Sequence, residues 1–247
     1  MLADIQRRTL AGISPQVTWH GAVEELPPGP CLVVANEFFD ALPVLQFVRT
    51  AEGWRERWVG VDESGALAFV LSESLLPAGQ VPDWAGNAEE ETIIEVSPAR
   101  EKAATALARR IAIGQGVALI IDYGHGRSAP GETLQAVRRH EHVGLLETPG
   151  LADLSAHVDF GALRRAFRKG GALTHGPLEQ GEFLARMFIE ERAEALKVHA
   201  DPSGRHQIDT AVRRLVAEDQ MGRLFKMLAA CHPDHPVPYP FGESDDD

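Results

Sequence analysis

The sequence predicts an α/β protein built around a doubly wound sheet, and two apolar runs carry this prediction. Cys31–Ala35 and Val117–Ile121 have the length and the β-branched content of buried parallel strands. Helical patterns alternate with these runs, as a doubly wound sheet requires. In such sheets ligands bind beyond the carboxyl ends of the strands, so the polar residues that follow each run are the first candidates for chemistry.

The segment before the first run is expected to contain a turn and an earlier strand. Pro27–Pro30 is a proline-rich turn that leads into the run. Trp19 and His20 precede it and are expected to end another strand of the sheet.

Three short alternating runs after Pro43 predict an antiparallel β insertion. They are Val44–Val48, Trp54–Val61 and Leu67–Leu71, separated by glycine-containing turns. Trp54, Glu56 and Trp58 share one face of the second run. Two interpretations of this face stay open: it covers a substrate crevice, or its tryptophans pack on the sheet.

The later elements are predicted from capping residues and helical spacing. Thr92–Val96 reads as a strand, followed by Ser97 as the cap of a helix that ends at Gly114 or Gly116. The buried face of this helix is marked by Ala103, Leu107, Ala108 and Ile111. Two further helices are expected, one capped by Asp159 over Gly161–Lys169 and one over Glu182–Lys197.

The residues that follow the first run are the strongest candidates for a functional site. They mix polar and aromatic side chains at a strand end: Asn36, Glu37, Phe38 and Asp40. For Asn36 and Asp40 a turn-capping role stays open, because short polar side chains bond nearby backbone groups. Glu95 lies in an otherwise apolar segment, where an unpaired carboxylate is costly, so we expect it to have a cationic partner or ligand.

The second run ends in a similar way. Asp122, Tyr123 and His125 follow it and are expected to line the next strand end. Another wall of the crevice beyond the strand ends is expected to be formed by Asp153, His157 and Asp159. For the tyrosine and the histidines a structural role stays open. No combination of histidines and cysteines completes a tetrahedral set, so no metal is expected.

Composition narrows the class of protein. The 247 residues are 44% hydrophobic, enough for a sizeable core, and the net charge of −12 argues against nucleic acid as a partner. Cys31 and Cys231 are too few for a disulfide framework, so we expect a reduced cytoplasmic setting. No apolar stretch approaches the roughly 20 residues of a membrane span. Residues 241–247 are predicted to be a disordered acidic tail.

Eight segments resemble, in the same order, the signatures of the MidA-like family of S-adenosylmethionine-dependent methyltransferases. They are NEFFDALPVLQFV (Asn36–Val48), GWRERWVG (Gly53–Gly60), EVSPAR (Glu95–Arg100), ALIIDYGH (Ala118–His125), ETLQAVRRH (Glu132–His140), DLSAHVDF (Asp153–Phe160), GPLEQGEFL (Gly176–Leu184) and MGRLFKML (Met221–Leu228). Matches in register across nearly the whole chain make chance a poor explanation. The family includes a mitochondrial protein arginine methyltransferase needed for respiratory complex I assembly.

The resemblance implies a Rossmann-like class I methyltransferase sheet, incomplete at the N-terminus, with a small antiparallel β insertion. It divides the chain into a partial core (1–43), the insertion (44–91) and the rest of the core with helical substrate-side elements (92–240). It also implies methyl transfer to a protein arginine, whose guanidinium a carboxylate can orient. Glu37, Asp40 and Glu95 are then the expected catalytic residues. The expected substrate-binding residues are Asn36, Phe38, Asp122, Tyr123, His125, His157 and Asp159.

The family's cofactor features are not found in this sequence. A Gly-rich loop and a ribose-binding carboxylate bind S-adenosylmethionine in the family, and only Asn36 is carried over as a cofactor contact. Met1–His20 resembles the helix after the family's second strand and its third strand. We therefore expect the chain alone to bind S-adenosylmethionine weakly or not at all.

Several interpretations of the whole molecule stay open. The chain is an active methyltransferase, one half of a split methyltransferase, or an inactive or assembly-factor fragment that binds proteins. The expected partner is a protein substrate, by resemblance a complex I subunit. A homodimer and a complementing N-terminal half are the assemblies considered.

Overall fold

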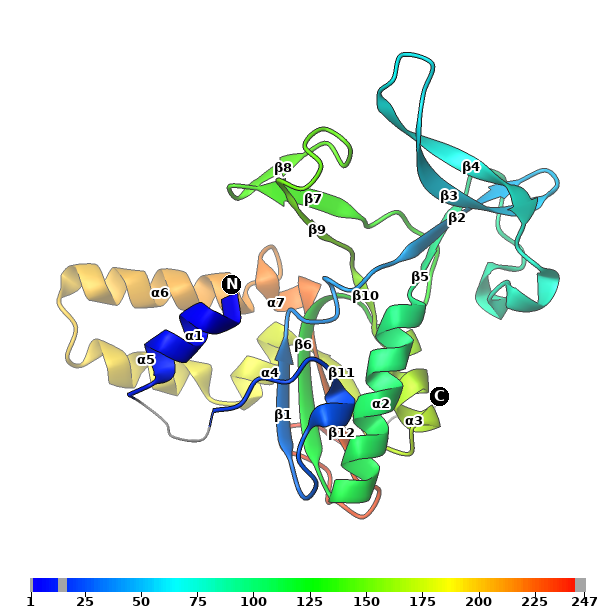
Figure 1. The fold of residues 1–247 in the computed structure, drawn as a ribbon. Helices are drawn as coiled ribbons and strands as arrows, with labels where there is room; N and C mark the ends of the chain where they lie inside the picture. Colours follow the sequence, from blue (N-terminus) through cyan, green and yellow to red (C-terminus); the bar gives the residue numbers. More distant parts are fainter. Residues whose placement is uncertain (1, 13–16, 243–247) are drawn as a thin grey trace.

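The computed structural model describes residues 2–12 and 17–242 of the chain (Figure 1). Its central sheet has the strand order β1-β6-β12-β11. The strands are β1 (Leu32–Asn36), β6 (Val117–His125), β12 (Phe225–Cys231) and β11 (Leu173–Glu179), and the short β10 (Val158–Asp159) pairs with the end of β6. β1 and β6 are parallel, with Leu32 opposite Val117, while β12 is antiparallel to both of its neighbours. The predicted α/β class and the two predicted parallel strands are confirmed.

Alternating side chains of the central strands build a core on each face of the sheet, because successive residues of a strand point to opposite faces. Ala118 and Ile120 of β6 belong to the larger core, with Leu228 and Ala230 of β12. The residues between them, including Met227 and Ala229, contribute to the smaller core on the other face.

Helices cover both faces of the central sheet (Figure 1). α2 (Pro98–Gly114) and α3 (Phe160–Lys169) pack together and supply Leu107, Ile111 and Phe167 to the larger core. The other helices are α1 (Leu2–Leu10), α4 (Gln180–Arg186), α5 (Ile189–Lys197), α6 (Pro202–Val216) and α7 (Met221–Leu224). Short 3₁₀ turns occur at Val23–Glu25, Ala78–Gln80 and Asp83–Ala85.

The predicted helix caps are confirmed, and one predicted helix is wrong. Ser97 accepts a hydrogen bond from the Arg100 N–H, and Asp159 accepts one from the Ala162 N–H at 2.9 Å. The helix expected over Glu182–Lys197 is instead two helices, because Phe188 adopts a left-handed conformation (φ 62°) between α4 and α5. α4 packs on the sheet, and the turn at Phe188 sends α5 outward to pack on α6.

The prediction that the first run is fully buried is also wrong. β1 is an edge strand with β6 as its only paired neighbour among the described residues. Leu32 is 89% exposed and Val34 is 69% exposed. The strand expected to end at Trp19 and His20 is not formed, since residues 17–20 have no regular structure.

A separate antiparallel sheet lies beyond the carboxyl ends of β1 and β6 (Figure 1). Its order is β4-β3-β2-β5, formed by β2 (Leu45–Thr50), β3 (Gly53–Val61), β4 (Leu67–Leu75) and β5 (Ile93–Val96). Trp54 is buried against Phe47 and Ile94, whereas Trp58 is 51% exposed. The two tryptophans therefore have different environments. A second small sheet, β8-β7-β9, comprises β7 (Gln135–Arg138), β8 (Glu141–Val143) and β9 (Asp153–Ser155).

The predicted acidic tail lies mostly outside the described residues, which end at Gly242. Phe241, which that prediction placed in the tail, is buried and packs against Phe183 with ring centroids 5.6 Å apart. Within the described ranges, no helix combines the length and the apolar character needed to cross a membrane.

Candidate functional site

The predicted site residues fall into three groups. Asn36, Glu37 and Phe38 lie exposed at the end of β1. Behind them, the side chains of Asp40, Asp122 and Tyr123 form a buried network. Beyond this network, a cavity is lined by the remaining predicted residues: Glu95, His125, His157 and Asp159. Asp153, in β9, is exposed and is not among the residues that line this cavity.

Glu37 has the most unusual backbone in the first group. Its φ of 46° is in the left-handed region, which costs a residue with a side chain roughly 1–2 kcal/mol. The Glu37 N–H donates to the Ile121 carbonyl at 2.9 Å and fixes this turn to the end of β6. The Asn36 amide donates to Glu37 Oε1 at 3.5 Å. Because strained residues cluster at functional sites, this geometry supports Glu37 as a functional residue.

The buried network fixes the chain after the Glu37 turn. Asp122, which is fully buried, accepts hydrogen bonds from the N–H groups of Phe39 (3.1 Å) and Asp40 (3.2 Å). The Tyr123 hydroxyl donates to Asp40 Oδ2 at 2.7 Å. Oδ1 of Asp40 has no hydrogen-bond partner among the described residues. These contacts favour a positioning role for Asp122 and Tyr123.

Burial alters the proton affinity of this network. Loss of solvation, followed by the negative charge of Asp40, raises the pKa of Asp122 to about 7 despite the backbone N–H groups that favour the carboxylate. Burial also raises the pKa of Tyr123 to about 12, so its hydroxyl stays a donor at neutral pH. The network therefore places a titrating carboxyl group beside a fixed proton donor.

Arg100 links the network to the cavity, and the sequence prediction did not assign it a role. Its guanidinium donates to the carbonyl oxygens of Phe39 (2.7 Å), His157 (2.7 Å), Asp40 (3.0 Å) and Ala156 (2.8 Å). Helical spacing could have revealed it, since Arg100 shares the buried stripe of α2 with Ala104, Leu107 and Ile111. A cation in such a stripe indicates a buried acceptor site.

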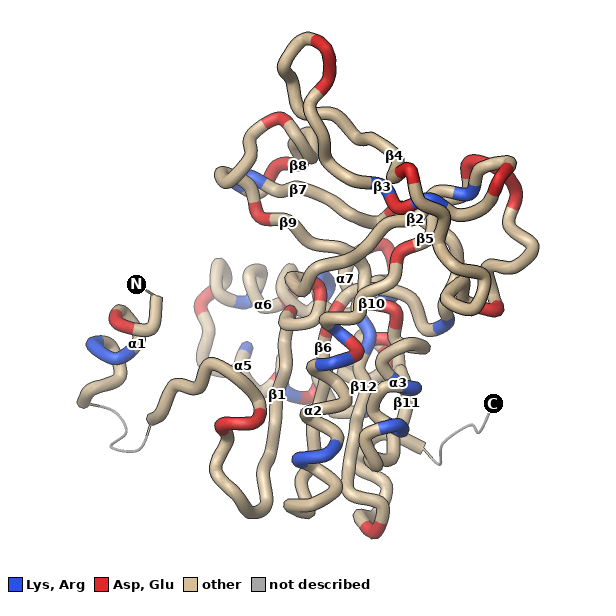
Figure 2. Tube along the Cα trace, turned by 45° about the vertical axis from the view of Figure 1, so that its right-hand side comes forward, with Lys and Arg blue, Asp and Glu red and all other residues tan. Residues whose placement is uncertain are grey.

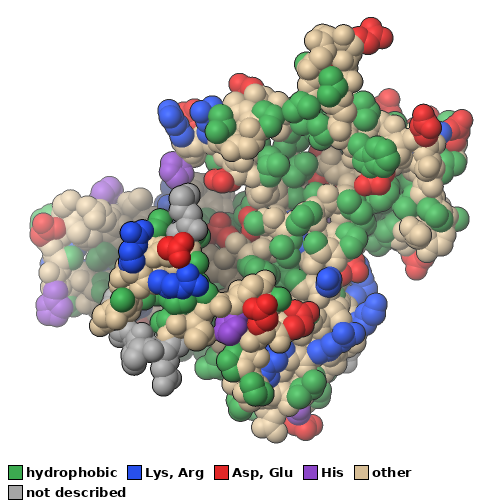
Figure 3. Space-filling view, viewed as in Figure 1, with side chains coloured by type: hydrophobic (Ala, Val, Ile, Leu, Met, Phe, Trp, Pro, Cys, Tyr) green, Lys and Arg blue, Asp and Glu red, His purple; other side chains and the backbone are tan. Residues whose placement is uncertain are grey.

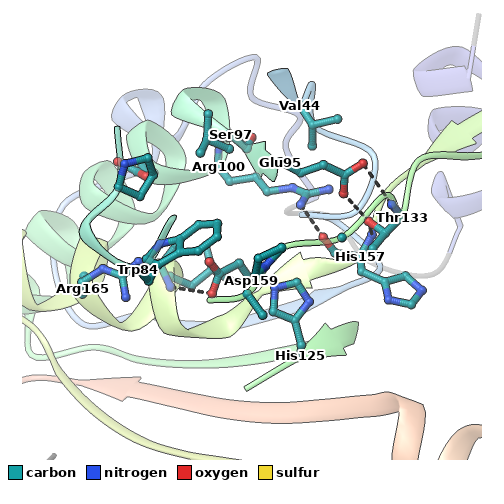
Figure 4. Close-up of a pocket in the computed structure, with 18 residues that line it drawn as sticks. Val44, Trp84, Glu95, Ser97, Arg100, His125, Thr133, His157, Asp159 and Arg165 are labelled. Carbon is teal, nitrogen blue, oxygen red and sulfur yellow. Dashed lines mark hydrogen bonds between the residues drawn. The ribbon is translucent and has the colours of Figure 1, made fainter. Parts of the chain in front are cut away.

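The cavity has a volume of about 330 Å³ and lies between the amino end of α2, the end of β6 and α3 (Figure 4). Glu95 accepts from Gln46 Nε2 (2.8 Å), from the N–H groups of Thr133 and Leu134 (3.0 Å each) and from the Thr133 hydroxyl. The expected cationic contact is not found, because its donors among the described residues are neutral. Glu95 therefore holds residues 133–134 in place by hydrogen bonds. The positive charge of Arg100 attracts the Glu95 carboxylate at longer range.

Asp159 and the two histidines form the opposite side of the cavity (Figure 4). Asp159 caps α3 with Oδ1 and accepts from the Ser128 hydroxyl at 2.5 Å with Oδ2. Burial lowers the pKa of His157, so its imidazole is neutral at physiological pH. Across the described part of the chain, no group of three or more His, Cys, Asp or Glu residues is arranged to hold a metal ion.

The end of β1 offers some of the polar groups that S-adenosylmethionine needs, beside an open edge of the sheet. Asn36 and Glu37 offer polar groups at one strand end, but exposed Leu32 and Val34 leave β1 without a second wall. Gly124 does not provide a cradle either, because a Cβ there would lie 2.0 Å from the Val158 carbonyl oxygen. This glycine is needed for the close approach of β10.

Comparisons with known proteins agree on the family. The model of the family described as "Putative S-adenosyl-L-methionine-dependent methyltransferase" matches residues 1–178. The mitochondrial protein arginine methyltransferase NDUFAF7 homolog of Caenorhabditis elegans is 34% identical over 227 residues, which are 91% of this chain and 52% of that protein. Mitochondrial NDUFAF7 of Mus musculus is 38% identical over 216 residues, 86% of this chain and 48% of that protein. The chain spans about half the length of the curated relatives it matches.

Two crystal structures from Burkholderia thailandensis share the fold. One, of an uncharacterized protein, has a TM-score of 0.80 and 32% identity, covering 94% of this chain and 63% of that one. The other, of a candidate methyltransferase bound to S-adenosyl-homocysteine, has a TM-score of 0.79 and 32% identity, with 94% and 61% covered. Together with the matched family model, these likenesses show that the chain belongs to the MidA-like family of S-adenosylmethionine-dependent methyltransferases.

Proposed function

We propose that this chain supplies the acceptor-binding side of an S-adenosylmethionine-dependent methyltransferase that acts on an arginine side chain of a protein. Family membership supports methyl transfer, and the names of the relatives support arginine as the acceptor. The observation that carries the proposal is the Glu37 carboxylate, exposed on a strained turn at the carboxyl end of β1.

The residues beside Glu37 suit a guanidinium. A carboxylate can accept two parallel N–H bonds from an arginine and thereby orient one nitrogen. The Phe38 ring, 46% exposed, offers a face on which a guanidinium can stack. Asn36 steadies the carboxylate through its amide. Bound S-adenosylmethionine supplies an activated methyl group, and the chain's own contribution is to hold the acceptor nitrogen in place.

The other predicted residues have supporting roles in this proposal. Asp40, Asp122 and Tyr123 position the segment that carries Glu37. Substrate contacts by the cavity residues Glu95, His125, His157 and Asp159 stay a prediction. So do a complex I subunit as the substrate and a cytoplasmic location.

A second candidate function is a protein-binding module, as expected for an assembly factor. Exposed apolar side chains on the insertion favour it: Trp58 is 51% exposed, Val59 55% and Val61 65%. Figure 3 shows hydrophobic side chains gathered over this part of the molecule. This second function does not require cofactor binding, so a measurement of cofactor binding distinguishes it from methyl transfer.

The deciding experiment is calorimetric titration of S-adenosylmethionine into two proteins. One is this chain, and the other is the chain fused to the amino-terminal segment of a family member. We expect binding by the fusion alone, together with methyl transfer to arginine-containing peptides. Binding by the unfused chain would overturn the assignment to an acceptor side. Cofactor binding by the fusion without transfer to any arginine peptide would favour the protein-binding module.

A further inference from the structure

The cavity of the candidate site contains polar side chains that no internal contact uses. Arg100 donates to four carbonyl oxygens, and both carboxylate oxygens of Asp159 accept hydrogen bonds. In contrast, the side chains of Glu101, His125 and His157 line the cavity without a hydrogen bond to any of the described residues. These three side chains are therefore free to bind an occupant.

The charge of the cavity lining favours a cation as the occupant. The charged lining residues are three carboxylates and two guanidinium groups: Glu95, Glu101, Asp159, Arg100 and Arg165. Negative charge is therefore in excess when the histidines are neutral. A neutral imidazole also offers an acceptor nitrogen to an N–H donor.

The apolar part of the lining suits the stem of a long side chain. Trp84 contributes an aromatic ring from the 3₁₀ turn Asp83–Ala85 (Figure 4), and Val96 and Leu163 add aliphatic surface. An aromatic face attracts a cationic head group, while the methylene stems of lysine and arginine pack on apolar surface. The volume of about 330 Å³ is at the lower end of the roughly 300–1,000 Å³ typical of ligand sites, which suits a single side chain.

The cavity lies within reach of a peptide that is held at Glu37. Arg100 lines the cavity and donates to the carbonyl oxygens of Phe39 and Asp40, which closely follow Glu37 in the chain. Because three extended residues span at most about 10–11 Å, the Glu37 turn and this wall of the cavity are close in space. An extended segment of about three to five residues can therefore join an arginine at Glu37 to a side chain in the cavity.

We propose that this cavity binds a second basic side chain of the protein substrate, a lysine or arginine about three to five residues from the methylated arginine. Since Glu37 is taken as the acceptor site, this subsite depends on the proposed function. Glu101 accepts hydrogen bonds from the cationic head group, and the Trp84 ring packs on it. Neither residue was predicted from the sequence, and both determine specificity for a segment with two spaced basic residues.

The test measures fluorescence anisotropy of labelled peptides mixed with the full chain. Each peptide has one arginine and, at a spacing of about three to five residues on either side, a lysine or the uncharged norleucine. The chain has a net charge of −12, and its Asp and Glu residues are spread over the central core and the β insertion (Figure 2), so every lysine peptide is attracted to some extent. We expect one spacing to exceed this background, with lysine binding about five- to tenfold more tightly than norleucine.

Two exposed carboxylates locate the site. Glu101→Gln should remove the preference for lysine at that spacing. Glu24→Gln is the matched control and should keep it, because Glu24 lines a neighbouring groove with Glu101 but does not line this cavity. Glu101→Lys should reverse the preference, so that glutamate in the lysine position binds more tightly. Equal binding of lysine and norleucine at every spacing, tighter binding of norleucine, or equal losses in the two glutamine variants would overturn the proposal.

A citrulline peptide separates this subsite from the proposed function. Citrulline has the shape of arginine without its charge, so in the acceptor position it should weaken binding to the unmodified chain and have little effect in Glu37→Gln. An effect of citrulline without any effect of lysine would overturn the second subsite alone. An effect of lysine without any effect of citrulline would overturn Glu37 as the acceptor site and support the cavity as a cation subsite. The same peptides, used as substrates of the fused protein, give the matching ratios of kcat/KM.

Discussion

The Tyr123 hydroxyl donates a 2.7 Å hydrogen bond to Oδ2 of Asp40, and both residues are more than nine-tenths buried. Asp40 follows β1, whereas Tyr123 lies in β6. The bond therefore ties the segment that carries Glu37 to the centre of the sheet. Asp40 Oδ1 has no hydrogen-bond partner among the described residues. The Tyr123 hydroxyl is therefore the donor that compensates for the burial of this carboxylate.

Tyr123→Phe should destabilise the protein by roughly 1–3 kcal/mol, because it removes the side-chain donor of a buried carboxylate. Urea unfolding measures the change. Tyr239→Phe is the matched control: its hydroxyl also donates a hydrogen bond, to the Arg186 carbonyl, but the residue is 67% exposed. Equal losses in the two variants would contradict a special role for the Tyr123–Asp40 pair.

Arg100→Lys should cost about 3 kcal/mol or more, although it keeps the positive charge. The ammonium group lacks the planar fork that reaches four carbonyl oxygens on two segments, so several buried acceptors would lose their donors. Arg109→Lys, at an exposed position of the same helix, should change stability by no more than about 0.5 kcal/mol. A small loss in Arg100→Lys would show that these acceptors are satisfied in another way.

The sequence predicts the parts of this fold that depend on local rules. The caps at Ser97 and Asp159 and the parallel pair of apolar strands follow from side-chain chemistry and periodicity. The break at Phe188 was missed because it depends on where α4 and α5 pack, which periodicity does not encode. The apolar run at Val34 indicates a strand but does not by itself reveal how many strands flank it, and Val34 is exposed on the open edge of the sheet.

For the site, the sequence predicted candidate residues at two strand ends, but not which of their side chains are buried and which are exposed. Asp122 and Glu37 look alike as carboxylates after strands. Only the fold shows that the first is fully buried and the second exposed on a left-handed turn. The neutral donors around Glu95 come from residues up to 49 positions away in sequence, beyond the reach of any local pattern.

The titration of Asp122 should make stability depend on pH. Its pKa is about 7 in the folded protein and near the ordinary value of 3.8 in the unfolded chain. Between these values the folded state binds more protons, so this group's contribution to stability falls as pH rises from about 4 to about 7 and is level above. In Asp122→Asn this decline should be absent.

The measurement compares urea midpoints of both proteins at about pH 5 and about pH 8. His157 and His175, whose pKa values are lowered by burial, contribute the opposite slope in both proteins, so the difference between the two isolates Asp122. Asp62→Asn is the control. The pKa of Asp62 is lowered by the Ser64 hydroxyl, so its contribution changes only at more acidic pH. Parallel pH profiles for Asp122→Asn and the unmodified protein would contradict the raised pKa.

Glu37→Gly should have opposite effects on stability and on activity. Glycine adopts a positive φ without the cost that Glu37 bears at 46°, so the free energy of unfolding should rise by about 0.5–1 kcal/mol. Gln115→Gly is the matched control. Gln115 has a φ of 57° at the end of α2, before the amino end of β6 and not at the carboxyl end that carries the predicted site residues, and should give a similar gain.

The activity of the same variants tests whether the strained residue Glu37 is needed for methyl transfer. In the fused, cofactor-binding protein, Glu37→Gly and the isosteric Glu37→Gln should each lower methyl transfer by at least about a hundredfold, because the acceptor guanidinium loses its carboxylate. Gln115→Gly should leave transfer unchanged. Since Glu37→Gln keeps the side-chain shape, its loss of transfer with an unchanged unfolding midpoint would locate the effect in the carboxylate charge. Full activity in Glu37→Gln would remove Glu37 from the acceptor site, whatever the stability of Glu37→Gly.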